Sequence, residues 1–372
     1  MHLKYIKAVN FRNYDKLSIT LSNKMNAFLG LNGMGKTNAL DAIYYLCIGK
    51  SYFSSGDRHA IKREADFFRL EGKFFKDQKA YGVVAKVIPS KLKELELNQK
   101  KYSKLSEHLG KFPCVIIAPS DILMLIEGSA ERRKLIDQCI SQYDPHYLRD
   151  LMSYTRLLNQ RNSLLKSFKE SRTSNQTLLD AFTAGMKSAA RNIHNTRVSF
   201  VEDLHWRFRE HYKNISNNAE ECSIVYKSDL ADKELDELFT ENLQKDLILA
   251  RTTSGIHKDD LLFYLGDEKL KPYASQGQLK SFILSVKLAE YDIIKKASGC
   301  LPILLLDDLF DKLDDQRTNE LLRILSTEEF GQVFISDTHQ IRIPEMLKEL
   351  NIESSVYIVS KGKILNYEDE EE

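Results

Sequence analysis

The chain has 372 residues, of which 42% are hydrophobic and 29% are charged, enough for a buried core in a soluble protein. A chain of this length is longer than those that usually fold around a single hydrophobic core, so we expect two lobes or one enlarged domain. The formal net charge of +1 is evidence neither for nor against a nucleic-acid ligand. A DNA-binding surface would therefore need local clusters of Lys and Arg.

The sequence lacks the features of a membrane or secreted protein. It contains no run of the roughly 18 apolar residues that a membrane-spanning helix requires. The segment from Met1 to Asn10 alternates apolar and polar residues and has no signal-peptide core. The five cysteines form no Cys-x-x-Cys pair, which favours separate thiols in a reducing cytoplasm, with a zinc site as the alternative. We therefore predict a cytoplasmic protein.

The first 125 residues are predicted to combine strands with one helix. Residues 1–30 have the alternation of two or three short strands, and a helical pattern runs from Asn38 to Leu46. Further strands are predicted at 67–75, 81–88, 92–104 and 112–118. A turn near Asn98 and Gln99 divides the third of these into a hairpin.

The middle of the chain has a helical pattern. Glycine almost disappears between Ala130 and Tyr212, apolar residues recur at helical spacing, and a polar break at 171–175 separates the helices. Strands are predicted again at 222–227, 261–265, 301–306, 333–336 and 356–359, and helices at 278–296 and 317–326. We therefore predict an α/β lobe formed by 1–125 and 249–372, with an inserted helical lobe at 126–248.

The segment from Gly30 to Asn38 carries the strongest functional signal. Its first eight residues fit the pattern Gly-x-x-x-x-Gly-Lys-[Ser/Thr] between a strand and a helix. Glycines let backbone N–H groups point at phosphate oxygens, and the helix start adds positive partial charge. Lys36 is expected to contact the phosphates and assist catalysis, and Thr37 to bind Mg²⁺. The predicted nucleotide contacts are Gly30, Leu31, Asn32, Gly33, Met34, Gly35, Lys36, Thr37 and Asn38.

A second functional segment is the apolar run from Leu301 to Leu306, which ends in two carboxylates. An unbroken apolar run is typical of a buried parallel strand, and the carboxyl ends of such strands face the ligand site. Asp307 is therefore predicted to hold Mg²⁺, directly or through water. Asp308 is predicted to be catalytic by polarising the attacking water.

A third segment, Ser275-Gln276-Gly277-Gln278, resembles the signature motif of ABC-type ATPases. The serine hydroxyl, the glycine N–H and the start of a helix would form another anion site. The resemblance implies that this motif closes over the γ-phosphate held by a second copy, so that ATP joins two subunits. It also implies an ABC-type P-loop ATPase head with an inserted α-helical lobe, a D-loop contact at Asp314 and a switch histidine at His339. An ordinary surface histidine is the alternative for His339.

More specific segments resemble the RecF family of bacterial recombination mediators, in order along nearly the whole chain. They are Gly49–Tyr52, Pro119–Asp121 with Arg132, Arg133 and Asp137, Gly255–Asp260, and Leu304–Asp314 with Arg317. Phe53 and Lys312 depart from the family pattern, which affects expectations about contacts around the nucleotide and the dimer seam. The residues predicted to contact phosphate or magnesium, and those of the signature motif, follow the family pattern.

The RecF resemblance implies ATP-dependent binding to DNA at gaps and single-strand/double-strand junctions, an ATP-dependent homodimer, and cooperation with RecR and RecO in recombinase loading. It also implies weak ATP hydrolysis as a release switch, and no membrane partner. Two basic groups could contact DNA phosphates, although each could equally be a solvated face: Lys91, Lys93, Lys100, Lys101 and Lys104, and Arg58, Lys62 and Arg63. The alternatives are the ATPase subunit of an ABC transporter, a chromosome-organising ATPase head and, least favoured, a small-molecule P-loop kinase.

Overall fold

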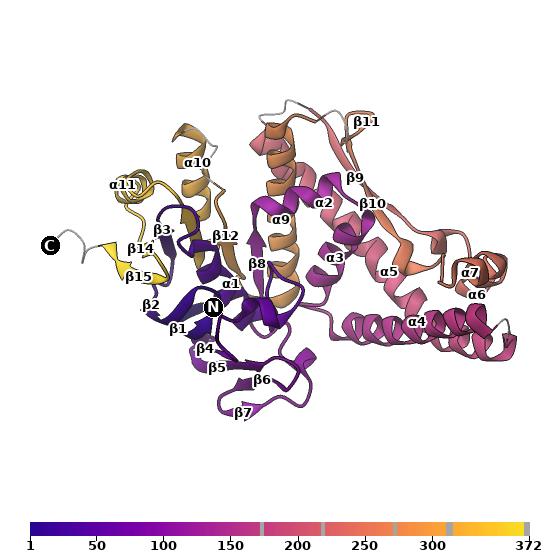
Figure 1. Cartoon of the computed structure of the whole chain (residues 1–372). Helices are drawn as coiled ribbons and strands as arrows, with labels where there is room; N and C mark the ends of the chain where they lie inside the picture. Colours follow the sequence, from indigo (N-terminus) through magenta and orange to yellow (C-terminus); the bar gives the residue numbers. More distant parts are fainter. Residues whose placement is uncertain (172–174, 217–219, 271–273, 310–314, 368–372) are drawn as a thin grey trace. The chain divides into compact units, whose positions relative to one another are not determined.

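The structure is a computed structural model of the chain, and it describes residues 1–171, 175–216, 220–270, 274–309 and 315–367. The chain divides into two compact units, of which the first contains Met1–Pro119 and Ile294–Glu372 and the second contains Ser120–Ile293 (Figure 1). We expected the insertion to end at residue 248, and the second unit continues beyond it. The segment after 248 packs on the helices of this unit, since the ring centroid of Phe282 lies 4.5 Å from that of Phe208.

The first unit contains an antiparallel sheet, ordered β2-β1-β4-β5-β6-β7 within the described residues. Its strands are β1 (His2–Phe11), β2 (Tyr14–Thr20), β4 (Phe68–Lys76), β5 (Lys79–Ile88), β6 (Leu92–Leu97) and β7 (Lys100–Lys101). Alternate side chains of β4, including Phe68, Leu70 and Phe74, are buried, so one face of this sheet belongs to the core. Asn98 and Gln99 have φ values of 50° and 66°, which confirms the predicted tight turn before β7.

The second sheet of this unit is parallel except for its last strand, β15, and is ordered β15-β14-β3-β13-β12-β8 within the described residues. Its strands are β3 (Met25–Leu29), β8 (Cys114–Ile117), β12 (Ile303–Leu306), β13 (Val333–Asp337), β14 (Ser354–Ser360) and β15 (Lys363–Asn366). Every residue of β3, β8, β12 and β13 is buried, as unbroken apolar runs predict. The short strand β15 was missed by the sequence analysis.

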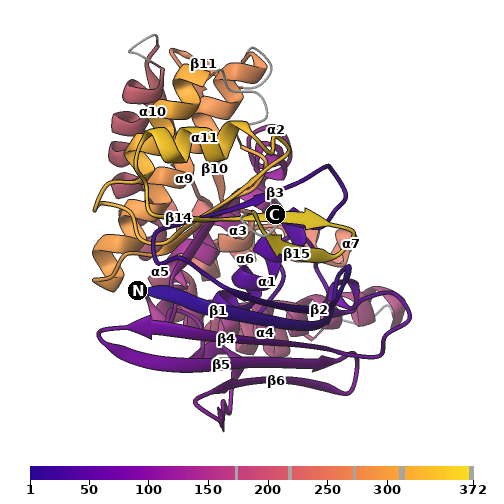
Figure 2. The ribbon, with the colours of Figure 1, turned by 90° about the vertical axis from the view of Figure 1, so that its left-hand side faces the viewer.

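Helix α1 (Lys36–Ile48) lies between these two sheets (Figure 2). The helix is covered on more than one side, because Leu40, Ile43, Tyr45 and Leu46 are all fully buried. Gly49 ends the helix with φ 82°, a left-handed conformation that glycine adopts without strain. The same unit contains α10 (Asp315–Leu325) and α11 (Arg342–Glu349).

The second unit combines helices with a small antiparallel sheet, ordered β11-β10-β9 within the described residues. The helices are α2 (Ile122–Ile126), α3 (Ser129–Ile140), α4 (Pro145–Ser171), α5 (Gln176–Ile215), α6 (Leu235–Glu241), α7 (Leu243–Leu249) and most of α9 (Gln276–Ser298). The strands are β9 (Cys222–Lys227), β10 (Asp260–Leu265) and β11 (Glu268–Lys269). Short 3-10 helices are η4 (Asp229–Ala231) and η5 (Ile256–Lys258) in this unit, η1 (Asp57–Ala60) and η2 (Leu105–Glu107) in the first unit, and η3 (Pro119–Asp121) at the boundary.

Arginine and aspartate residues of the family segments form a polar core in this unit together with Arg197, which the sequence analysis did not select. Arg132 makes a bidentate ion pair with Asp260, at 2.6 and 3.0 Å. Arg197, which is 1% exposed, donates hydrogen bonds to Asp137 at 2.8 Å and to Asp259 at 2.7 Å. These contacts join α3, α5 and the start of β10, so the family segments help to hold the second unit together.

Two general features concern thiols and membranes. The five cysteines are free thiols, and Cys47, Cys114, Cys139 and Cys222 are buried. Among the described residues, no group of three or more His, Cys, Asp and Glu side chains could hold a metal ion. In the same part of the chain, no helix combines the length and the hydropathy needed to span a bilayer.

Candidate nucleotide-binding site

Three neighbouring parallel strands position the candidate site. The glycine-rich loop follows β3, the carboxylates Asp307 and Asp308 follow β12, and β13 lies between these strands with Ser336 near its end. Because the strands are parallel, their carboxyl ends meet at one edge of the sheet. The loop and the carboxylates, which are far apart in the sequence, are therefore neighbours.

The backbone conformation favours glycine at three positions of the loop, and close packing adds to this at two of them. Gly30, Gly33 and Gly35 have φ values of 151°, 80° and 122°. A Cβ atom on Gly30 would lie 2.3 Å from the carbonyl oxygen of Val359, and one on Gly35 would lie 2.5 Å from Asn13 Nδ2. A Cβ on Gly33 would meet no atom within 4 Å, so at this position only the backbone conformation favours glycine. These features fit a backbone curled to present N–H groups to phosphate oxygens.

The ammonium group of Lys36 lies within the loop. Its side chain is 3% exposed, and Nζ donates hydrogen bonds to the carbonyl oxygens of Gly30 at 2.8 Å and Leu31 at 3.3 Å. The same Nζ lies 3.8 Å from Asp308 Oδ1. A buried positive charge held by loop carbonyls is suited to contact an anion that enters the loop.

A hydroxyl and a carboxylate connect the loop to the strand β12. The Thr37 hydroxyl donates to both carboxylate oxygens of Asp307, at 2.8 and 3.0 Å, and the Ser336 hydroxyl donates to Oδ1 at 2.7 Å. Burial raises the pKa of Asp307 above its ordinary value, and the hydrogen bonds from Ser336 and Thr37 act in the opposite direction. Hydroxyl and carboxylate oxygens are the ligands that Mg²⁺ prefers, so Thr37 and Asp307 fit this ion.

Asp308 has a strained backbone and a partly open side chain. Its φ of 43° lies in the left-handed region, which costs free energy in a non-glycine residue. The conformation is supported by a 2.9 Å hydrogen bond from the Asp308 N–H to the Ser336 hydroxyl. The side chain is 28% exposed, whereas Asp307 is 4% exposed. The two carboxylates therefore suit different tasks, one buried beside Thr37 and the other open to small molecules.

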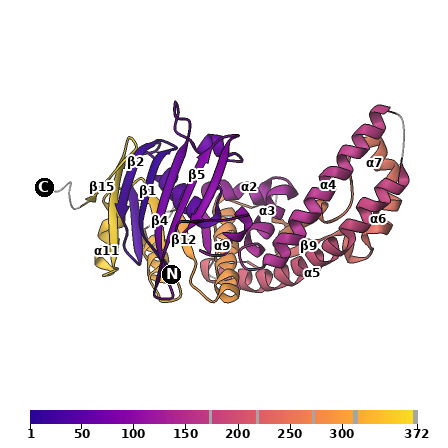
Figure 3. The same ribbon diagram turned by 90° about the horizontal axis from the view of Figure 1, so that it is seen from below.

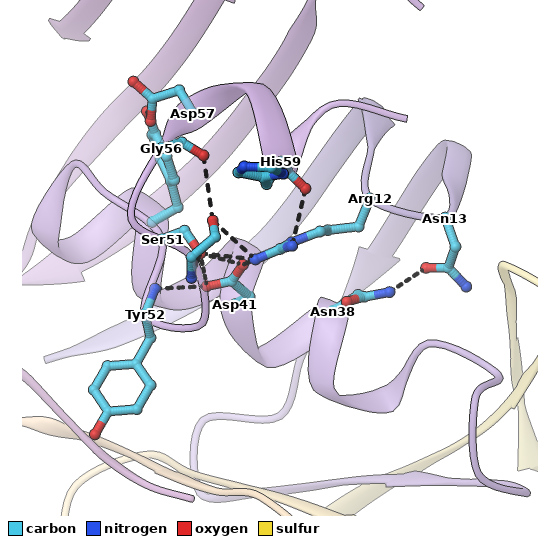
Figure 4. A network of polar contacts seen from close by, with 11 residues as sticks. Arg12, Asn13, Asn38, Asp41, Ser51, Tyr52, Gly56, Asp57 and His59 are labelled. Atoms are coloured by element: carbon cyan, nitrogen blue, oxygen red, sulfur yellow. Dashed lines mark hydrogen bonds and ion pairs between the residues drawn. The ribbon is translucent and has the colours of Figure 1, made fainter. Parts of the chain in front are cut away.

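Figure 4 shows a polar network beside the loop, in which Ser51 and Tyr52 of the selected segment Gly49–Tyr52 contact Arg12 and Asp41, two residues that the sequence analysis missed. Arg12 donates to Asp41 Oδ2 through Nε at 3.1 Å and through a terminal nitrogen at 2.8 Å, and it also donates to Ser51 Oγ and to the His59 carbonyl oxygen. Asp41 is fully buried on α1 and accepts hydrogen bonds from the Ser51 hydroxyl and the Tyr52 N–H. The network holds the turn after β1 and the segment after α1 together.

Asn13, in the same turn, contacts the glycine-rich loop directly. Its side-chain amide donates to the Met34 carbonyl oxygen at 2.8 Å. It also accepts a hydrogen bond from the Asn38 amide at 2.8 Å (Figure 4). The Tyr14 hydroxyl donates to the Gly35 carbonyl oxygen at 2.9 Å. The only sequence signal for these residues was the polar break Arg12-Asn13 between two apolar-patterned strands, which by itself indicates an ordinary turn.

The signature-like segment begins α9 in the second unit. Ser275, Gln276 and Gly277 are exposed. The Ser275 N–H donates to Gln278 Oε1 at 2.6 Å and the Gln278 N–H donates to Ser275 Oγ at 3.2 Å, an arrangement that caps the helix. The Gln278 amide also donates to Glu220 at 2.6 Å. The segment is therefore an ordered helix start with an accessible surface.

Two predicted nucleotide contacts remain, His339 and Asp314. His339 is exposed, its N–H donates to Asp337 Oδ1 at 2.8 Å, and its side chain lines a pocket of about 870 Å³ together with Leu31 of the loop. His339 thus lies on the same side of the unit as the glycine-rich loop. Asp314 lies outside the described residues.

Comparisons with known proteins agree along nearly the whole chain. Residues 2–363 match the family described as RecF/RecN/SMC N terminal domain. The chain is 40% identical over 348 residues to the DNA replication and repair protein RecF of Flavobacterium johnsoniae, covering 94% of this chain and 97% of that protein. It is 35% identical over 364 residues to the protein of the same name from Cytophaga hutchinsonii, covering 98% and 96%.

Solved structures agree with this result. The chain matches a structure titled recombination mediator protein RecF-ATP in RecFOR pathway with a TM-score of 0.89 and 30% identity, covering 98% of this chain and 97% of that one. A head of Smc bound to the C-winged helix domain of ScpA, at a TM-score of 0.58 and 17% identity, shares the fold alone. The predicted ABC-type ATPase head with a helical insertion is confirmed. The chain belongs to the RecF family of DNA replication and repair proteins.

Proposed function

We propose that the glycine-rich loop and the carboxylates at the end of β12 bind ATP with Mg²⁺. The observation that carries this proposal is the contact of the Thr37 hydroxyl with both oxygens of Asp307, at 2.8 and 3.0 Å across 270 positions of sequence. The loop from Gly30 to Asn38 would hold the phosphates through its N–H groups and through Lys36. Thr37 and Asp307 would hold Mg²⁺, which when bound offsets the phosphate charge.

We further propose that ATP joins two copies of the chain. Ser275, Gln276, Gly277 and Gln278 of one copy would contact the γ-phosphate in the loop of the other, which their exposure at a helix start allows. Asp314 and His339 would contribute to the same seam. Asp308 would orient and polarise the attacking water, because its open carboxylate lies 3.8 Å from the Lys36 ammonium.

The DNA-related function rests on family membership. We propose that the ATP-bound dimer binds gapped DNA and single-strand/double-strand junctions and acts with RecR and RecO in recombinase loading, since a solved relative is titled a recombination mediator of the RecFOR pathway. Slow hydrolysis would weaken the seam and release the DNA. A transporter ATPase subunit or a chromosome-organising head is less favoured, because the relatives named RecF match the chain over nearly its full length.

Lys36→Met tests nucleotide-driven dimerisation. Removing the buried ammonium should prevent ATP from increasing the molecular mass measured by light scattering, whereas the parent should double its mass. Lys24→Met is a matched control, because Lys24 forms an ion pair with Glu328 at the surface. A Lys36→Met protein that still dimerises like the parent would contradict the proposed nucleotide contact.

Asp308→Asn tests the release step. The amide has nearly the same shape but cannot take a proton from water, so the dimer formed with ATP should stay on gapped DNA longer than the parent. Dissociation is followed with a fluorescent gapped duplex after addition of unlabelled competitor, and Asp267→Asn, at an exposed position, is the control. Equal dissociation rates for Asp308→Asn and the parent would argue against the assigned role.

A further inference from the structure

The antiparallel sheet of the first unit has one face in the core and one open face. Leu3, Ile6 and Ala8 of β1 point into the core that includes α1, so His2, Tyr5 and Lys7 point outward. The register of β1 with β4 places Tyr5 opposite Lys73 and His2 opposite Phe75 on that outward side. Figure 3 shows this side of the sheet toward the viewer, with no described helix of the first unit covering it.

Aromatic rings and cations alternate on this open face. The Lys7 ammonium lies 5.5 Å from the centroid of the Tyr5 ring, and the Lys73 ammonium lies 5.6 Å from that of Phe75. His2 stacks on Phe75 with centroids 5.4 Å apart and an angle of 10° between the rings. The rings of Tyr5 and Phe75 lie on two adjacent strands and are partly exposed, and their contacts with Lys7, His2 and Lys73 hold them in place.

The charges of the face are unbalanced in favour of cations. Four lysines lie on four adjacent strands of this face: Lys16 on β2, Lys7 on β1, Lys73 on β4 and Lys86 on β5. None of the four has a carboxylate within 4.0 Å among the described residues. The acidic residues are already engaged in part, because Glu71 pairs with Arg69 at 2.7 Å and Glu94 pairs with Lys101. Glu96, on β6, lies near the far edge of the sheet.

Three of the eight basic residues selected from the sequence already form ion pairs. Lys93 lies 2.9 Å from Asp57, Lys101 pairs with Glu94, and Lys62 pairs with Asp15. These ion pairs neutralise positive charge that would otherwise attract the phosphates of DNA. The open lysines of the sheet face were not apparent from the sequence, because they are scattered between positions 7 and 86 and only the strand pairing brings them together.

We propose that this open sheet face binds single-stranded DNA, with bases stacked on Tyr5 and Phe75 and phosphates contacted by Lys7, Lys16, Lys73 and Lys86. Single strands expose base faces that stack on aromatic rings, and a cationic surface tracks their backbone. A duplex presents phosphates but keeps its bases stacked inside, so the rings would add nothing to its binding. The inference rests on the proposed DNA function and assigns a surface to the single-stranded part of a gap.

The test measures fluorescence anisotropy of the full-length chain with a labelled thymidine oligonucleotide of about 20 nucleotides and with a duplex of equal length. Tyr5→Thr with Phe75→Thr removes the rings and places in both strands a β-branched residue, which favours strand structure. This variant should bind the single strand about 5- to 150-fold more weakly for each stacked base that is lost, and the duplex within about twofold of the parent. Lys7→Gln with Lys73→Gln should reduce the slope of log affinity against log salt by about 1.4 for the single strand.

The matched control is Lys227→Gln with Lys348→Gln, which removes two exposed lysines that lie outside the sheet. Binding of ATP and thermal unfolding are measured for each variant, so that a folding defect is recognised. If the Tyr5→Thr, Phe75→Thr variant retains its fold and binds the single strand as tightly as the control does, the inference is overturned. The open face would then be a candidate surface for a protein partner. Equal losses for single strand and duplex would overturn the inference as well. If the parent binds neither DNA, the proposed DNA function itself fails.

Discussion

Ser336→Ala gives the sharpest test of the magnesium site, because one hydroxyl supports both carboxylates. Ser336 is fully buried on β13. Its Oγ donates to Asp307 Oδ1 at 2.7 Å and accepts the hydrogen bond of the Asp308 N–H at 2.9 Å. The substitution removes both contacts and leaves the backbone of β13 unchanged. It therefore perturbs the position of Asp307 without altering any predicted ligand.

The expected magnitude follows from these two contacts. A hydrogen bond to a charged group contributes about 1.5–3 kcal/mol, and an unpaired buried N–H costs about 1–3 kcal/mol, with partial relief because Asp308 is partly open. Groups that orient a metal ligand change metal affinity about 10- to 100-fold when they are removed. We therefore expect Ser336→Ala to weaken the Mg²⁺-dependent part of ATP binding by about 10- to 100-fold.

The assay titrates a fluorescent ATP analogue in the presence of Mg²⁺ and again in the presence of EDTA. Only the affinity with Mg²⁺ should fall for Ser336→Ala. Ser285→Ala is the matched control, because Ser285 is also fully buried but donates only to the Ser281 carbonyl oxygen of its own helix. If Ser336→Ala binds the analogue with Mg²⁺ within about twofold of this control, the support that we ascribe to Ser336 is refuted.

Further predictions concern stability, measured as the free energy of unfolding in urea. Gly35→Ala should destabilise the protein more than Gly33→Ala, because both have positive φ but only Gly35 lacks room for a Cβ atom; equal losses would contradict this. Arg161→Met should cost about 3–5 kcal/mol, because it leaves a buried carboxylate unpaired, whereas Lys187→Met at an exposed pair should cost much less. Burial lowers the pKa of His257 to about 4, below its unfolded value of 6.5, so stability present above pH 6.5 is lost as the pH falls toward 4. Between pH 8 and 5 the parent should lose about 2 kcal/mol more than His257→Gln, and parallel curves would exclude this contribution.

The elements around the site were largely predictable because their signals are local. The loop from Gly30 to Thr37 depends on backbone conformations that glycine permits, and these can be read from neighbouring residues. The apolar run that ends in Asp307 likewise indicates a buried strand by itself. The placement of the loop after one strand and of the carboxylate after another then follows from the general geometry of parallel sheets.

The residues that complete the site were decided only by tertiary structure. Ser336 and Asn13 are single polar residues with no distinguishing neighbours, and they gain their roles because strand order and a turn place them on Asp307 and on the glycine-rich loop. The open lysines of the antiparallel sheet are likewise separate in sequence and become one surface through strand pairing. Sequence alone thus determined the phosphate loop, the strand that carries the carboxylates and the family. Hydrogen bonds and charge clusters between distant positions depended on the fold, since short-range polar interactions form only where packing brings their partners within reach.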